Sequence, residues 1–71
     1  MKIGERLQQL RKEKGISQEK LAEQLHVTRQ AVSKWETGQS YPDLDNLGAL
    51  CKLYGVTADY ILYGEDTKTQ K

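Results

Sequence analysis

Apolar residues in the segment 18–38 recur with the spacing of two short α-helices, and a break centred on His26 separates them. The apolar positions are Leu21, Ala22 and Leu25 in the first run and Ala31, Val32 and Trp35 in the second. Residues three or four apart share one face of a helix, so each run predicts a helix with one buried seam. The segment therefore predicts two short helices joined by a tight turn.

The second of these helices, which we expect to begin at Thr28, has a polar face opposite its seam. That face carries Arg29, Gln30, Ser33 and Lys34. When a helix lies in the DNA major groove, Arg and Lys match the acceptors of guanine, and Gln matches the donor and acceptor of adenine. Two short helices, a tight turn and such an outer face indicate a helix-turn-helix that reads double-stranded DNA.

The apolar spacing in the rest of the chain predicts three more helices. A first helix over residues 2–14 has a stripe at Ile3, Leu7 and Leu10. A fourth helix follows Asp43, and its stripe is Leu44, Leu47, Leu50, Cys51 and Tyr54. A short fifth helix begins after Thr57 and carries Tyr60, Ile61 and Leu62. We therefore expect an all-α, compact five-helix bundle over residues 1–63, followed by a polar tail or linker over residues 64–71.

Residues suited to begin and end helices stand at the borders of these segments. Ser, Thr and Asp are favoured at the first position and glycine just past the last one. The expected N-caps are Ser17, Thr28, Asp43 and Thr57, and the expected stops are Gly15, Gly38 and Gly55. These signals agree with the borders drawn from apolar spacing.

Composition narrows the possible functions. The net charge of the 71 residues is only +1, but residues 1–40 hold eight Lys and Arg against five Glu, which gives +3, and residues 41–71 hold three Lys against five Asp and Glu, which gives −2. No run approaches the about 20 apolar residues of a membrane span. His26 and Cys51 are the single histidine and cysteine, too few for a zinc site. We expect no enzyme activity, no cofactor or metal, no membrane association and no small-molecule ligand.

Three motifs stand out in the sequence: LRKEKGISQEKLAEQL over residues 10–25, VTRQAVSKWETGQSYPDLDNL over residues 27–47 and LYGVTADYIL over residues 53–62. In this combination the chain resembles the lambda-repressor-like, Cro-type helix-turn-helix domain, also called the XRE family. The resemblance implies a cytoplasmic five-helix domain of bacterial or phage origin. It also implies that the domain binds operator DNA, usually as a dimer.

The resemblance assigns roles to single positions. The implied base-reading residues are Arg29, Gln30 and Lys34, with Ser33 beside them. The implied phosphate contacts are Gln18, Thr28, Thr37, Gln39 and Ser40. An internal ion pair is implied between Arg11 and Glu36. His26 stands where glycine is common in the family, at a turn position that commonly needs a positive φ, which histidine tolerates better than most residues.

Several residues have a second interpretation. Gln18 lies at a helix N-terminus, where the dipole favours an anion, but an ordinary exposed residue would fit as well. Trp35 lies on the buried seam, which favours core packing over stacking on a base. The fifth helix and its flank supply the expected dimer contact, unless these side chains instead close the bundle against the first helix. The expected dimer residues are Tyr60, Ile61, Leu62 and Tyr63.

We therefore expect a sequence-specific transcriptional regulator, and a repressor rather than an activator, because occupying a promoter is enough to block it. The alternative is a protein-interaction module with the same fold, antitoxin-like or polymerase-binding. Such a module would not need a base-matching face on its third helix.

Overall fold

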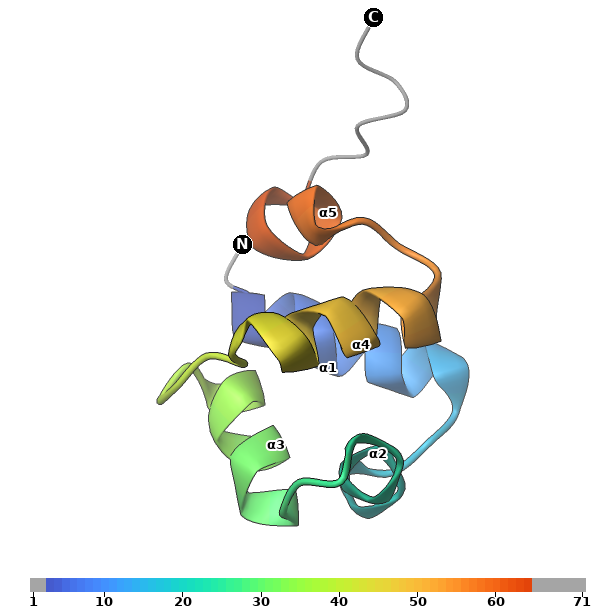
Figure 1. Ribbon diagram of the computed structural model, residues 1–71, viewed down its shortest axis with the longest axis vertical. Helices are drawn as coiled ribbons and strands as arrows, with labels where there is room; N and C mark the ends of the chain where they lie inside the picture. The colour runs from blue at the N-terminus through green and yellow to red at the C-terminus, as the bar shows by residue number, and fades with distance from the viewer. Residues whose placement is uncertain (1–2, 65–71) are drawn as a thin grey trace, which may run out of the picture.

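The computed structural model describes residues 3–64, which form five α-helices and no β-strand (Figure 1). The helices are α1 (Ile3–Lys14), α2 (Gln18–Leu25), α3 (Arg29–Thr37), α4 (Leu44–Tyr54) and α5 (Ala58–Tyr63). The predicted all-α fold with five helices is therefore confirmed. Apart from Gly64, the tail or linker predicted over residues 64–71 lies outside the described residues.

None of the helices within residues 3–64 has the length and apolar character needed to cross a lipid bilayer.

The last four helices begin and end at residues that satisfy their terminal backbone groups. Each N-cap side chain accepts a hydrogen bond from the amide three residues ahead, at 2.9–3.1 Å. The pairs are Ser17 with Lys20, Thr28 with Ala31, Asp43 with Asn46, and Thr57 with Tyr60. The same helices end at residues in the left-handed conformation, which are His26, Gly38, Gly55 and Gly64. The predicted caps are confirmed, and the borders of the helices follow from local sequence.

One core is shared by all five helices. Its buried members are Leu7, Leu10, Leu21, Ala22, Val32, Trp35, Leu50 and Ile61. Trp35 lies in this core, as the seam of its helix predicted. In Figure 1, α2 and α3 lie at one end of the molecule, α5 lies at the other, and α1 and α4 lie between them. The core therefore holds the two helices of the predicted DNA-binding unit at one end.

Leu44 departs from the predicted buried stripe of α4. Its residue exposure is 85%, whereas Leu47 is half-buried and Leu50 is fully buried. Leu44 is the first residue of α4, directly after the cap Asp43. Helical spacing tells which face a residue occupies, but not how far along that face the neighbouring helices extend.

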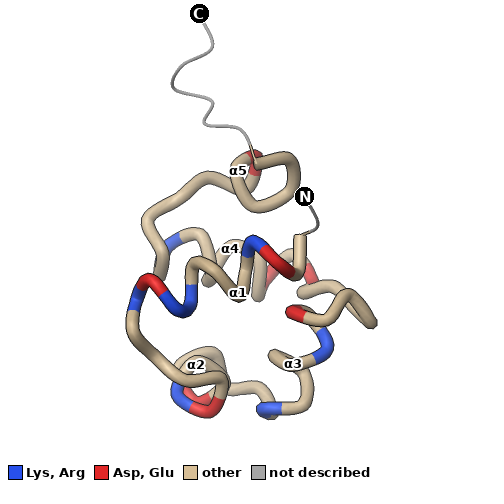
Figure 2. Tube along the Cα trace, turned by 180° about the vertical axis from the view of Figure 1, so that it is seen from behind, with Lys and Arg blue, Asp and Glu red and all other residues tan. Residues whose placement is uncertain are grey.

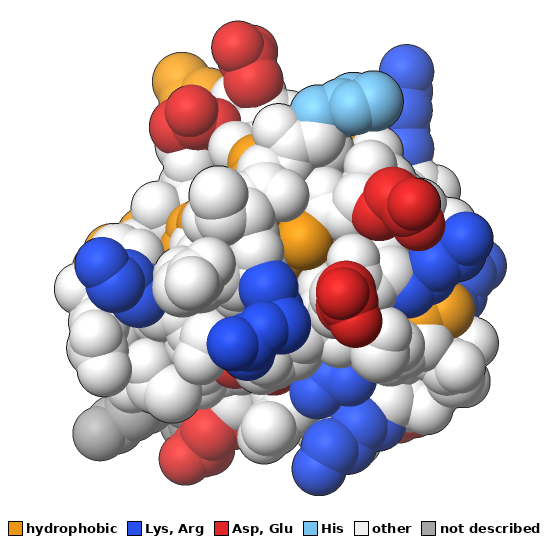
Figure 3. Space-filling model, turned by 90° about the horizontal axis from the view of Figure 1, so that it is seen from below, with side chains coloured by type: hydrophobic (Ala, Val, Ile, Leu, Met, Phe, Trp, Pro, Cys, Tyr) orange, Lys and Arg blue, Asp and Glu red, His pale blue; other side chains and the backbone are white. Residues whose placement is uncertain are grey.

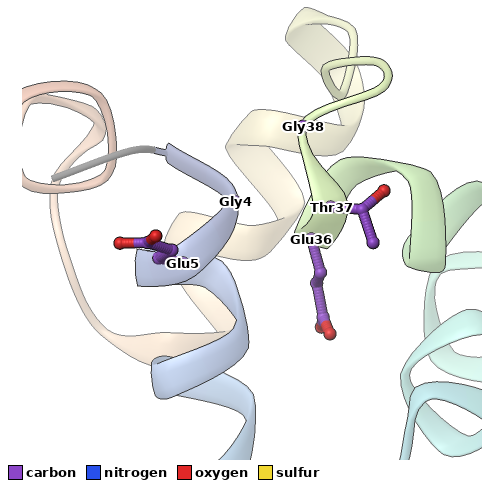
Figure 4. Close-up of a pocket in the computed structure, with 5 residues that line it drawn as sticks. All are labelled: Gly4, Glu5, Glu36, Thr37 and Gly38. Carbon is purple, nitrogen blue, oxygen red and sulfur yellow. The ribbon is translucent and has the colours of Figure 1, made fainter.

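The first turn of α1 packs directly on the last turn of α3 (Figure 4). A Cβ atom added to Gly4 would lie 2.5 Å from the carbonyl oxygen of Glu36 and 2.6 Å from that of Trp35. Backbone atoms fill the space that a larger residue would need. The glycine at this position therefore allows the close approach that fixes the C-terminal end of α3 against α1.

Candidate nucleic-acid interface

The residues predicted to read bases lie on the outer face of α3. Arg29, Gln30 and Lys34 are exposed and Ser33 is half-buried, whereas Val32 on the opposite seam is fully buried. Within residues 3–64, neither Arg29 nor Lys34 takes part in an ion pair. The structure therefore presents a guanidinium, a carboxamide and an ammonium group together at the surface of one helix.

The surface around α2 and α3 is polar and mixed in charge. Figure 3 views the molecule from the end where these helices lie, and shows Lys and Arg side chains interspersed with Asp and Glu. Figure 2 shows both basic and acidic positions on α2, and two basic positions followed by an acidic one on α3. Attraction to a phosphate backbone would therefore come from individual Lys and Arg side chains and from neutral donors, rather than from a broad positive field.

Thr28 caps α3, and its hydroxyl oxygen accepts a hydrogen bond from the Ala31 amide at 3.1 Å. This bond uses the oxygen as an acceptor and leaves the hydroxyl proton available for a further acceptor. Thr28 is exposed at the start of the polar face. Capping and the predicted phosphate contact are therefore compatible at this residue.

The loop after α3 folds back onto the end of the helix. The amides of Gln39 and Ser40 donate to the carbonyl oxygen of Lys34 at 2.9 and 3.3 Å, and the Thr37 hydroxyl donates to the same oxygen at 3.3 Å. These bonds occupy the backbone donors at the start of the loop. A phosphate contact here would therefore rely on the side chains of Gln39, which is exposed, and Ser40, which is half-buried. Thr37 is exposed as well, but its hydroxyl would have to exchange its bond to Lys34 for one to phosphate.

The ion pair implied between Arg11 and Glu36 is present in the structure. Arg11 Nε donates to Glu36 Oε2 at 2.8 Å, and the two side chains are 11% and 2% exposed. A second Arg11 nitrogen donates to Oε1 of the same carboxylate at 3.3 Å, and a third donates to the carbonyl oxygen of Ile16 at 2.8 Å. Arg11 therefore joins α1, the α1–α2 loop and α3.

Gln18 meets the same carboxylate, which sequence reasoning did not anticipate. Its Nε2 donates to Glu36 Oε1 at 3.0 Å. The predicted phosphate contact on α2 and the predicted ion pair are therefore parts of one hydrogen-bond network. No sequence signal pointed to this bond, because Gln18 and Glu36 lie on different helices and come together only in the folded chain.

Tyr54 lies close to this network from α4. The pKa of its phenol is raised to about 12, chiefly by burial and also by the negative charge of Glu36, while the positive charge of Arg11 opposes the rise. Its buried hydroxyl has no hydrogen-bond partner among the described residues. Tyr54 was predicted to belong to the core, and it is half-buried against that core.

The turn between α2 and α3 is built on His26, which adopts the predicted left-handed conformation with φ 60° and ψ 42°. Its backbone amide donates to the carbonyl oxygens of Ala22 and Glu23, and the Val27 amide donates to Ala22 at 3.0 Å. His26 itself is exposed. The turn thus closes on α2 through backbone bonds, and α3 begins directly after its cap, Thr28.

The dimer contact predicted on α5 needs a correction. Ile61 is fully buried in the core, so it offers no surface to a second chain. Tyr60 is half-buried, and the Arg6 guanidinium lies 5.9 Å from the centre of its ring. Leu62 and Tyr63 remain exposed. In a helix of six residues that packs on a core, one side must face inward, and the apolar run did not reveal which side.

The described residues contain no cluster of three or more His, Cys, Asp or Glu that would hold a metal ion. A hollow between α1 and α3 is lined by Gly4, Glu5, Glu36, Thr37 and Gly38. Figure 4 shows that the side chains of Glu5 and Thr37 point away from each other. Because its polar groups do not converge, this hollow lacks the geometry of a ligand site.

Comparison with known proteins gives one consistent result. A family model described as helix-turn-helix matches residues 7–61. The HTH-type transcriptional activator BcrR of Enterococcus faecalis is 49% identical over 69 residues, covering 97% of this chain and 34% of that protein. The HTH-type transcriptional regulator DicA of Escherichia coli (strain K12) is 39% identical over 66 residues, covering 93% of this chain and 49% of that protein. This chain thus spans half or less of these two relatives.

A solved structure agrees with these sequence matches. The crystal structure of the P22 c2 repressor protein in complex with a synthetic operator superposes with a TM-score of 0.86 at 35% sequence identity. The match covers 92% of this chain and 98% of that one. The similarity therefore extends over the whole arrangement of helices.

Proposed function

Since this chain belongs to the Cro/XRE-type helix-turn-helix family, we propose that it is the sequence-specific DNA-binding domain of a transcriptional regulator. It would insert α3 into the major groove of an operator, in the cytoplasm where bacterial and phage DNA lie. Phosphate contacts from Gln18, Thr28 and the loop after α3 would hold the domain in register, and the base edges would be read by α3.

The observation that carries this proposal is the exposed face of α3. Arg29 and Lys34 suit the two acceptors of guanine, and Gln30 suits the donor and acceptor of adenine. Ser33 lies between them, half-buried, where its hydroxyl would reach a base or a phosphate. On an arbitrary helix these side chains would simply be solvated, but α3 is the second helix of a helix-turn-helix, where the exposed face is the one that enters the groove.

The experiment begins with selection of bound sites from random duplex DNA. Arg29→Ala or Lys34→Ala should weaken binding to the selected duplex by roughly 1–3 kcal/mol if the residue makes a bidentate base contact. Lys52→Ala removes the same charge from an exposed position on α4 and is the matched control, which should retain specific affinity. Unchanged specific affinity in the Arg29/Gln30/Lys34 triple alanine variant would contradict the proposal.

The alternative is a protein-interaction module that uses the same fold. The exposed base-matching residues of α3 favour DNA binding over this alternative. Measuring duplex affinity of the isolated domain against salt concentration separates the two functions. For DNA binding through phosphates, the logarithm of the association constant falls linearly with the logarithm of the salt concentration. An interaction module would show no such binding to the duplex.

The direction of regulation depends on where the operator lies. A domain bound across a promoter blocks polymerase, so we retain repression as the proposed effect. The relatives include both a transcriptional activator and Repressor protein C2 of Salmonella phage P22, which is 36% identical over 67 residues and covers 94% of this chain. A reporter assay with the selected operator placed over the promoter tests repression directly.

We further propose that two copies bind a pseudo-palindromic operator, since one helix covers about half of a typical site. After the correction at Ile61, the exposed part of the predicted contact is Leu62 and Tyr63. This pair would bury less than the roughly 1,200 Å² of stable complexes, so the dimer would be weak without DNA.

Analytical ultracentrifugation with and without operator tests this assembly. Tyr63→Glu should abolish the two-to-one complex. Lys52→Glu is the matched control, because it introduces a carboxylate at an exposed position on α4, outside α5 and outside the loop after α3. A dimer that survives Tyr63→Glu would mean that the contact lies elsewhere.

A further inference from the structure

One buried carboxylate, that of Glu36 on α3, joins α3 to α1 and α2. Glu36, with a side chain 2% exposed, accepts two hydrogen bonds from Arg11 and one from Gln18. Gln18 begins α2, and Thr37 follows Glu36 directly at the end of α3. Both Gln18 and Thr37 are proposed phosphate contacts. Glu36 thus lies beside both proposed contacts, since its carboxylate bonds the side chain of Gln18 and its backbone continues into Thr37.

The bond from Gln18 restrains a side chain that is otherwise mobile. A glutamine carboxamide has two N–H donors on one nitrogen and an acceptor oxygen, and it rotates freely unless a partner holds it. Glu36 takes one donor of Gln18 at 3.0 Å. A hydrogen bond to a charged acceptor is roughly twice as strong as a neutral one. The second N–H and the carboxamide oxygen remain available to other groups.

The positive charge of Arg11 allows the Glu36 carboxylate to lie beside a side chain that is proposed to bind phosphate. A lone negative charge beside a phosphate-binding group would repel the phosphate. The Arg11 guanidinium lies 2.8 Å from Glu36 and compensates that charge within the network. The pair can therefore orient Gln18 without setting a net negative charge against the DNA.

We propose that Glu36 is a positioning residue for DNA binding: it holds the carboxamide of Gln18 so that the second N–H donates to a backbone phosphate. This inference rests on the proposed function, in which Gln18 contacts phosphate. It adds that the Gln18 carboxamide already has its DNA-binding orientation in the free domain. Ordering of this side chain is then complete before DNA arrives, which lowers the entropic cost of binding.

A double-mutant cycle on DNA affinity tests the coupling. The variants are Gln18→Ala, Glu36→Gln and the two combined, measured at a temperature where circular dichroism shows all of them folded. Glu36→Gln acts through the charge of Arg11 in both backgrounds, but it should weaken binding about tenfold more when Gln18 is present than in the Gln18→Ala background, a coupling of about 1.4 kcal/mol. Equal weakening in both backgrounds would overturn the proposal, because a purely structural role acts alike with and without Gln18.

A measurement on the wild-type domain avoids any dependence on folding of the variants. NMR order parameters of side-chain amides should show Gln18 ordered in the absence of DNA and Gln39, in the exposed loop, mobile on the picosecond to nanosecond timescale. Equal mobility of the two carboxamides would overturn the proposal. The DNA affinities of single variants also separate the positioning role of Glu36 from the proposed DNA-binding function. If Gln18→Ala binds DNA normally while Arg29→Ala does not, the positioning role is wrong and the proposed function stands.

Discussion

The guanidinium of Arg6 donates a hydrogen bond to the backbone carbonyl oxygen of Ile61 at 2.7 Å, joining α1 to α5 across 55 residues of sequence. Both residues are buried. Arg6 thus places a cation at the C-terminal end of α5, where the helix dipole favours positive charge. A helix of six residues is not stable alone, so its place in the fold depends on contacts of this kind.

Arg6→Met should loosen α5, because it keeps a side chain of similar length and removes the donor to Ile61. Leaving that carbonyl oxygen unpaired is expected to cost about 1–3 kcal/mol of unfolding free energy. Hydrogen exchange should quicken at the amides of α5 more than at those of α3. Arg6→Lys retains the positive charge, and its unfolding free energy should lie between those of wild type and Arg6→Met. A Met variant as stable as wild type would show that the bond contributes nothing net.

The same substitution should have opposite effects at two glycines. Gly4→Ala places a Cβ against backbone oxygen atoms of α3, and overpacking of this kind costs about 1–3 kcal/mol or more. A Cβ atom added to Gly48, within α4, would instead meet open space, so Gly48→Ala should raise stability by about 0.8–1 kcal/mol. Thermal melts of both variants test this. A Gly4→Ala variant as stable as wild type would refute the account of α1–α3 packing, whereas a destabilised Gly48→Ala variant would show only that the space beside α4 is not open.

The buried hydroxyl of Tyr54 predicts a dependence of stability on alkaline pH. Its pKa is raised from 10.0 to about 12 in the folded protein. The folded state therefore holds this proton more tightly than the unfolded chain does, and the resulting stabilisation is complete below pH 10 and lost as the pH rises toward 12. Tyr54→Phe should be at least as stable as wild type at pH 7, since the hydroxyl is buried without a partner among the described residues.

Denaturant titrations of wild type and Tyr54→Phe at pH 7 and pH 11 provide the measurement. The stability of the variant relative to wild type should increase at the higher pH. Tyr63→Phe, at an exposed side chain, is the control for loss of a phenol and should leave the stability at both pH values unchanged. If Tyr54→Phe is less stable at pH 7, its hydroxyl has a partner that strengthens the fold.

His26→Gly should be neutral or stabilising by up to about 1.6 kcal/mol. The left-handed region costs a residue with a Cβ roughly 1–2 kcal/mol, and the greater freedom of the unfolded glycine chain offsets about 0.4–1 kcal/mol of the relief. His26→Ala keeps the Cβ and should bring no such gain. A clear fall in melting temperature for the glycine variant would assign the imidazole a stabilising contact.

Local features of the fold were predictable from the sequence. The caps Ser17, Thr28, Asp43 and Thr57 bond within three residues of themselves, so their sequence neighbourhood is enough to identify them. The left-handed turn at His26 was expected from the family resemblance and not from the residue type, because glycine is the residue common at that turn. The face of α3 followed from the spacing of its seam, because the opposite side of a buried stripe must be exposed.

Features that depend on the neighbours of a helix were not predictable. Leu44 lies on the apolar stripe of α4 but is exposed, and Ile61 was expected at a surface but is buried. Both errors have one cause: spacing defines a face, and the packing partner decides which part of that face is covered. The hydrogen bond between Gln18 and Glu36 joins residues 18 positions apart, so no local sequence pattern predicts it.

The capping of the last four helices also bears on how quickly the domain forms. Each of these helices has a capping residue at both ends, so its boundaries are set by the local sequence and not by contacts with distant parts of the chain. Helical domains dominated by such local contacts fold in microseconds to milliseconds. A ribosome adds about 5–20 residues per second, or one roughly every 50–200 ms. The domain should therefore fold in less time than a ribosome needs to add one amino acid.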